Sequence, residues 1–183
     1  MRRPPDGPNS LGRNLLHGFA NGVLDFEKIL IWEDDDWYAP ERIKNQVAHL
    51  NRWGLYGYNC SLYYNLQTRG VFKNENYSHG SLYETAMRRE EAQKFVEVIK
   101  KNVNQPFLDI LLWKNIKGKL DKQQGLALGI KGGKGRSGLG GGHDKETLTY
   151  TQAKLEYYIG GDAKNYEFQR ATELPEDFAA CRG

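Results

Sequence analysis

An acidic run placed directly after a short apolar stretch constrains this chain more than any other feature. Residues 29–32 (Ile-Leu-Ile-Trp) are continuously apolar and too few for a helix, so residues 28–32 are predicted to form a short buried strand. The acids at 33–36 follow, and Pro40 suits the first turn of a helix. Strand, acidic loop and helix follow one another in the order that places ligands at strand ends in open α/β sheets.

The four acids of this run are Glu33, Asp34, Asp35 and Asp36. Carboxylates this close repel one another, and a strand end is partly desolvated, so either a cation offsets the charge or the pKa values rise. Mg²⁺ and Mn²⁺ prefer oxygen ligands of this kind. The alternative is a solvated turn whose acids cap the helix at Pro40. The spacing alone leaves both interpretations open.

Apolar residues at helical spacing predict four helices. The first follows Ser10 and ends near Gly22, the second covers residues 41–53, the third covers 89–101, and Pro106 opens the fourth. The residues predicted to face inward are Leu11, Leu15 and Phe19 in the first helix, Ile43, Val47 and Leu50 in the second, and Ala92, Phe95, Val96 and Ile99 in the third.

Further strands are predicted where Tyr, Leu, Val and Phe gather. Residues 55–64 and 69–74 are predicted to form a hairpin that turns at 67–70. Strands are also expected at 81–87 and at 125–130. Alternation of such strands with helices predicts an α/β fold.

Length and composition favour one domain spanning residues 1–183, with an irregular lead-in at 1–8 and a peripheral C-terminal segment at 150–183. Hydrophobic residues make up 39% of the chain and charged residues 27%, which excludes a disordered or membrane composition. No apolar run approaches the roughly 20 residues of a membrane-spanning helix, and no apolar signal segment begins the chain, so a cytoplasmic location is expected. The formal charge of +3 is mild and rules out neither nucleic acids nor anionic small molecules. The basic residues are mostly scattered, and no nucleic-acid partner is expected.

A glycine-rich segment, expected as a mobile loop at residues 131–145, is the second candidate for ligand binding. So many glycines cost too much backbone entropy for regular structure. Glycines let backbone N–H groups approach a phosphate closely, and Lys131, Lys134 and Arg136 would add positive charge. His143, at the end of the segment, offers an imidazole to a metal. The alternatives are a plain linker and a histidine that only packs or faces solvent.

Residues 32–43 (WEDDDWYAPERI) resemble the DxD segment of family-2 glycosyltransferases of the GT-A fold. Residues 12–14 (Gly-Arg-Asn) resemble the helix that precedes this segment in the family. Asp109, followed by Leu112 and Trp113, is similar to the segment that carries the catalytic acid, and residues 129–143 are similar to a Gly-rich loop that ends in Gly-His in some members. The resemblance runs through roughly residues 10–145 in the order of the family.

The resemblance implies a GT-A-like mixed sheet flanked by helices, and inverting transfer of a sugar from a nucleotide-diphosphate donor to a carbohydrate or other hydroxyl acceptor. Two registers fit the DxD motif, Glu33-x-Asp35 and Asp34-x-Asp36, and the position of Trp37 favours the first. The resemblance also implies Mn²⁺ or Mg²⁺ as the cofactor. The residues so assigned are Asp35 and His143 for the metal, Arg13, Glu33, Asp34, Lys131 and Arg136 for the donor diphosphate, and Asp109 as the base.

Asp109 has an alternative interpretation as an acid of the first helical turn, which the helix dipole favours. The chain also shows nothing like the nucleotide-binding βαβ unit with which family members begin, so an N-terminally truncated fold is expected. An exposed sheet edge would then favour a homo-oligomer. The rival functions are a non-catalytic binding module of the same fold and, less favoured, a metal-dependent phosphodiesterase.

Overall fold

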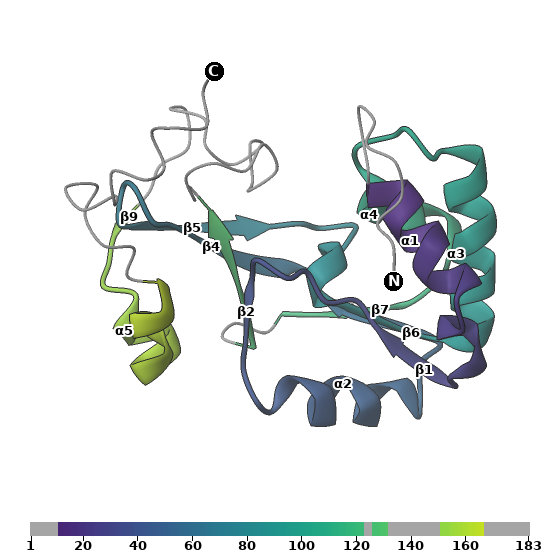
Figure 1. Cartoon of the computed structure of the whole chain (residues 1–183). Coiled ribbons are helices and arrows are strands. Elements are labelled where there is room, and N and C mark those ends of the chain that lie inside the picture. Colours follow the sequence, from purple (N-terminus) through teal and green to yellow (C-terminus); the bar gives the residue numbers. More distant parts are fainter. Residues whose placement is uncertain (1–10, 123–125, 132–150, 167–183) are drawn as a thin grey trace, which may run out of the picture.

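The computed structural model describes residues 11–122, 126–131 and 151–166, and these form an α/β fold of mixed sheets flanked by helices (Figure 1). The helices are α1 (Leu11–Ala20), α2 (Arg42–Leu50), α3 (Arg89–Lys101), α4 (Leu108–Asn115) and α5 (Glu156–Ile159), with 3-10 turns η1 (Val23–Asp25), η2 (Leu82–Glu84) and η3 (Gly160–Tyr166). The strands are β1 (Lys28–Leu30), β2 (Trp37–Tyr38), β3 (Leu55–Tyr58), β4 (Cys60–Asn65), β5 (Gly70–Glu75), β6 (Thr85–Arg88), β7 (Lys119–Asp121), β8 (Ala127–Lys131) and β9 (Thr151–Gln152).

The first sheet has the strand order β1-β6-β3-β7 and lies between two helical layers. Alternate side chains of its strands point to opposite faces. Leu55 and Met87 pack in the core formed with α1, α3 and α4, whereas Tyr56 and Ala86 pack with Leu50 of α2. Figure 1 shows α2 on one side of this sheet and α1, α3 and α4 on the other. The predicted strand at 28–32 is confirmed in β1, which covers Lys28–Leu30, and the Ile31 N–H adds a bond to the Thr85 carbonyl of β6.

The third predicted helix is confirmed by α3, which buries Ala92, Phe95 and Ile99. The predicted inner face of the second helix is confirmed at Leu50 and wrong at Ile43. In α2 the buried residues are Arg42, Gln46 and Leu50, and Ile43 is 52% exposed. Arg42 and Gln46 turn inward because Arg42 donates to the Ile31 carbonyl and Gln46 donates to the Glu84 carbonyl.

The second sheet has the order β2-β8-β4-β5-β9. The predicted hairpin is confirmed in β4 and β5, which pair antiparallel from Cys60↔Glu75 to Asn65↔Gly70. One face of this sheet is covered by α5 and η3, so this part of the C-terminal segment closes a core. That core contains Leu62, Tyr64, Leu128, Ile130, Leu155, Ile159 and Ala163.

The two sheets meet at Asn59, where the structure divides a stretch that was expected as one strand. The Asn59 N–H donates to the Asp121 carbonyl of β7, while the Asn59 carbonyl accepts from Asn76 after β5. One residue therefore pairs with both sheets, and the chain changes sheet there. The strand expected from Ser81 also starts late, because residues 82–84 form the turn η2.

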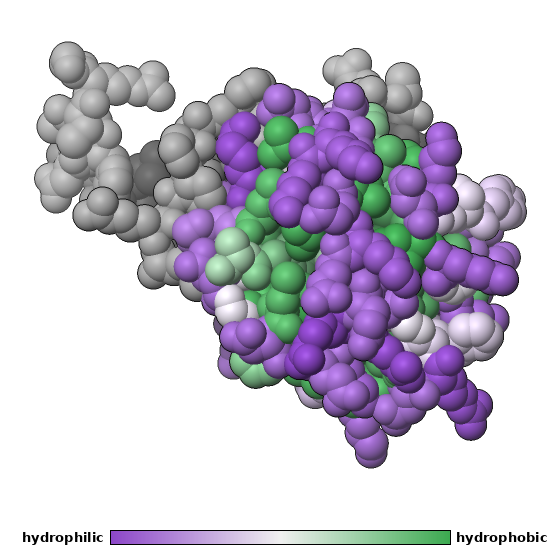
Figure 2. Space-filling view, turned by 90° about the vertical axis from the view of Figure 1, so that its right-hand side faces the viewer, coloured by the Kyte–Doolittle hydropathy of each residue, from purple (hydrophilic) through white to green (hydrophobic). Residues whose placement is uncertain are grey.

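The face that carries α1, α3 and α4 is not uniformly polar. Figure 2 shows apolar side chains gathered in a band among polar ones on this side of the molecule. Two large apolar side chains at the start of α4 reach solvent, Phe107 with 64% and Ile110 with 42% exposure. Among the described residues, no helix has the length and apolarity needed to cross a membrane.

Candidate functional site

The acidic run turns back on itself after β1 and brings three of its four carboxylates together. Glu33, Asp35 and Asp36 each offer an oxygen, and these oxygens lie within 4.8 Å of one another. Asp34 is exposed and is not part of this group. The structure therefore gathers both acids of the Glu33-x-Asp35 register and adds Asp36.

Asp36 is the most deeply placed of the three. Its side chain has 0% exposure, and its Oδ1 accepts from the Ile130 N–H at 2.8 Å and from Lys131 Nζ at 3.4 Å. Its Oδ2 is buried and has no hydrogen-bond partner among the described residues. A buried carboxylate oxygen without a donor is costly, and an added cation would supply the missing partner.

Burial also changes the protonation of this group. Loss of solvent, with the Asp36 charge adding to it, raises the pKa of Glu33 to about 7. Burial raises the pKa of Asp36 to about 6, and the charge of Lys131 opposes that rise. Lys131 therefore offsets only part of the cost of these buried acids.

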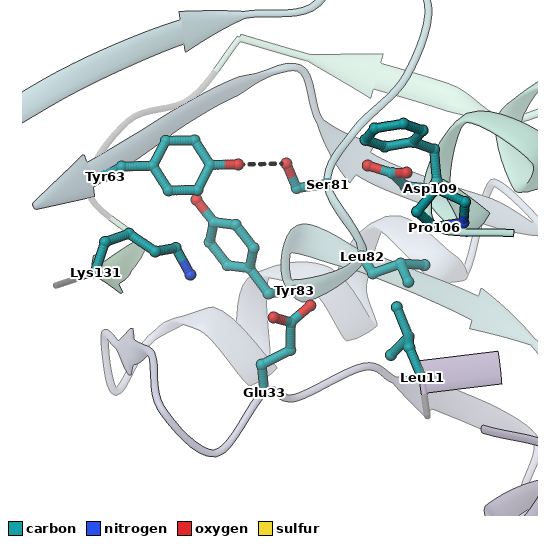
Figure 3. A pocket seen from close by; sticks show the side chains of 10 residues that line it. Leu11, Glu33, Tyr63, Ser81, Leu82, Tyr83, Pro106, Asp109 and Lys131 are labelled. Carbon is teal, nitrogen blue, oxygen red and sulfur yellow. Dashed lines mark hydrogen bonds between the residues drawn. The ribbon is translucent and has the colours of Figure 1, made fainter. Parts of the chain in front are cut away.

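A cavity of about 210 Å³ adjoins the acidic group (Figure 3). It brings together three residues that the sequence assigned to the site, Glu33, Asp109 and Lys131, each from a different element. Figure 3 shows the Glu33 and Asp109 carboxylates at separate places around the cavity, with Lys131 beside Tyr63. The other lining residues are Leu11, Tyr63, Ser81, Leu82, Tyr83, Pro106 and Phe107.

Behind the cavity, a chain of hydroxyl groups leads to a buried acid. Tyr63 Oη lies 3.1 Å from Ser81 Oγ, and Ser81 Oγ lies 2.9 Å from Ser61 Oγ. The Ser61 hydroxyl donates to Glu84, which is only 3% exposed. Burial raises the pKa of Glu84 to about 8. Sequence reasoning missed Ser61, Ser81 and Glu84, because their spacing carries no signal of a shared site.

The remaining predicted residues are placed as follows. Asp109 lies in the first turn of α4, and its Oδ1 accepts the Ile110 N–H at 2.9 Å, so a role at the helix start and one at the cavity are both compatible with its position. Arg13 lies on α1 and does not line the cavity, and its Nε and Nη2 have no hydrogen-bond partner within the described part of the chain.

Lys131 is the last residue of β8 and is buried, which corrects its expected place in a loop. Its Nζ instead lies between Asp36 and the ring of Tyr63, 5.7 Å from the ring centroid. Arg136, His143 and the rest of the glycine-rich segment lie outside the described residues, so the prediction of a loop there stays a prediction.

Comparison of the chain with protein families, with curated proteins and with solved structures finds no significant match. The likeness to glycosyltransferases therefore rests on the residues of this chain alone.

Proposed function

We propose that this chain binds a nucleotide-diphosphate sugar through a divalent cation and transfers the sugar, with inversion, to a hydroxyl acceptor. The observation that carries the proposal is the group of Glu33, Asp35 and Asp36, with the unpartnered Asp36 Oδ2, beside a cavity that also contains Asp109. The GT-A-like character of the fold belongs to the same proposal.

The donor atoms fit Mn²⁺ or Mg²⁺. Glu33, Asp35 and Asp36 present only carboxylate oxygens, which suit a hard cation. A bound cation of this kind supplies Lewis-acid stabilisation of a leaving diphosphate. Lys131 lines the cavity and would place a positive charge near a phosphate oxygen. Asp34 and Arg13 remain proposed contacts to the donor.

Asp109 is the proposed base. As the acceptor oxygen bonds to the anomeric carbon and the bond to the diphosphate oxygen breaks, the Asp109 carboxylate takes the proton of the acceptor hydroxyl. Its place in the cavity, apart from the three gathered acids, supports this division of roles.

Calorimetric titration with Mn²⁺, alone and with a panel of nucleotide sugars, tests the binding site. We expect metal-dependent binding of one donor, abolished by Asp35→Asn and retained in Glu90→Gln, which removes an exposed acid of α3. Failure of the folded wild type to bind any donor would overturn the proposal. Donor binding with no transfer to any hydroxyl acceptor would instead assign a non-catalytic binding module.

The Asp109→Asn variant tests the proposed base. The amide cannot accept the proton, so we expect turnover to fall by roughly 10²–10⁴-fold while the donor affinity stays unchanged. Initial rates and calorimetry on the same preparation separate these two quantities. Loss of donor binding together with folding would assign Asp109 a purely structural role in α4.

A further inference from the structure

Arg42, the first residue of α2, has a fully buried side chain. Charged side chains are almost never fully buried unless something compensates the charge. Here the guanidinium carbon lies 4.8 Å from the ring centroid of Trp32 and 4.4 Å from that of Tyr38. These two aromatic residues flank the acidic run, since Trp32 precedes Glu33 and Tyr38 follows two residues after Asp36.

The contacts of Arg42 reach the backbone of the run as well. Its Nη2 donates to the Ile31 carbonyl at 2.8 Å, at the point where the chain leaves β1. The guanidinium lies over the ring of Tyr38. The hydroxyl of Tyr38 accepts the Glu33 N–H at 2.8 Å. Arg42 thus contacts the start of the run directly and, through Tyr38, the backbone of its first acid.

These contacts do not satisfy the guanidinium. Its Nε and Nη1 are buried and have no hydrogen-bond partner among the described residues. Burial lowers the pKa of Arg42, and Glu84, the acid that opposes this fall, is itself buried and has a raised pKa. A buried ion held this way contributes little to stability. The presence of Arg42 at this position is better explained by its effect on the conformation of the loop.

We propose that Arg42 is a positioning residue: its planar guanidinium, packed against the adjoining rings of Trp32 and Tyr38, fixes the backbone of residues 31–38 so that the carboxylates of Glu33, Asp35 and Asp36 meet. The predicted effect of Arg42 on metal affinity rests on the proposed function, whereas its predicted effect on the backbone of residues 31–38 does not. A lysine cannot replace Arg42, because an ammonium group lacks the flat face and the forked donors of the guanidinium group.

Hydrogen–deuterium exchange tests the inference on the metal-free protein. In Arg42→Lys we expect amides in residues 31–38 to exchange at least ten times faster than in the wild type. Lys44→Gln, which removes an exposed charge from the same helix, should leave them unchanged. Ile99→Val, which lowers stability from a core remote in sequence, controls for global destabilisation.

A second variant keeps the test decisive if Arg42→Lys does not fold. Tyr38→Phe keeps the ring beneath the guanidinium and removes the acceptor of the Glu33 N–H. We expect faster exchange at the Glu33 amide in this variant. The inference would be overturned if the amides of residues 31–38 exchanged at the wild-type rate in Arg42→Lys and Tyr38→Phe, or in whichever of the two variants folds.

Mn²⁺ affinity, measured by electron paramagnetic resonance, separates this inference from the proposed function. If the wild type binds Mn²⁺, folded Arg42→Lys should bind it at least ten times more weakly, and equal affinity would overturn the inference. If the wild type does not bind Mn²⁺, the proposed metal site fails, and the exchange experiment alone decides the role of Arg42.

Discussion

At the scale of single residues, burial of acids is the dominant feature of this protein. The sequence predicted that close acids at a strand end need either a cation or raised pKa values. In the structure, burial raises the pKa of Glu33 to about 7 and that of Asp36 to about 6. Glu84, with a pKa of about 8, was not anticipated, because the residues that bury it come from distant parts of the chain.

Glu84 should make the stability of the protein depend on pH. Its folded-state pKa lies above the ordinary value of 4.5, so the stability that it contributes is complete below about pH 4.5 and is lost as the pH rises through about 8. In Glu84→Gln, which has no titrating group there, the difference in unfolding free energy between pH 5.5 and pH 8.5 should shrink by about 1–3 kcal/mol.

Urea unfolding of the wild type and the variant at both pH values measures this difference. Glu90→Gln, which removes an exposed acid, should reproduce the wild-type pH dependence. An unchanged pH dependence in Glu84→Gln would show that Glu84 is not held protonated by burial.

At the scale of elements, local pattern was sufficient where apolar side chains alone decide the buried face. The inward residues of α3 followed directly from their spacing. In α2 the pattern failed, because Arg42 and Gln46 turn inward to carbonyl groups 11 and 38 residues away in the sequence. The closeness of Glu33 and Asp35 followed from the sequence because both acids lie in one short turn. Their neighbours in the cavity come from other elements, so local pattern could not identify them.

The pairing of β4 with β8 makes a glycine necessary opposite Tyr63. A Cβ on Gly129 would lie 2.5 Å from Cδ1 of Tyr63, its partner in the register. In Gly129→Ala the ring must move and leave Ser81, so we expect a loss of about 1–3 kcal/mol of stability. Urea unfolding measures the loss, and near-UV circular dichroism reports the ring.

The matched control for this substitution is Gly161→Ala in η3, where an added Cβ meets no atom within 4 Å. It should unfold at the wild-type urea concentration. Equal stability of Gly129→Ala and the wild type would mean that the ring of Tyr63 is not held against β8.

At the scale of the whole molecule, the sequence predicted an α/β fold and its hairpin but not the assignment of strands to sheets. A hairpin depends on neighbouring residues, whereas the change of sheet at Asn59 depends on partners in β7 and after β5. For the same reason the cavity could not be predicted, since its walls come from β4 and β8 of the second sheet, from α1 and α4, and from the segments between elements.

The shared strand connection predicts that both sheets unfold as one unit. Phe95→Ala removes a fully buried ring from the core beneath the first sheet, so we expect a loss of about 3–5 kcal/mol. Lys94→Ala, an exposed neighbour, is the control and should cost little. Hydrogen exchange in increasing denaturant should show that, within each protein, β6 and β4 open at one shared free energy. This free energy should be lower in Phe95→Ala than in the wild type. Opening of β4 at the wild-type free energy in Phe95→Ala would contradict a single unit.

The change of sheet at Asn59 is matched by a second link between the sheets at the acidic run, where Asp36 accepts the Ile130 N–H of β8. Glu33 follows a strand of the first sheet and Tyr63 belongs to the second, while one connecting residue joins β3 to β4. The acidic run is therefore held to the first sheet through β1 and to the second through Asp36 and β2.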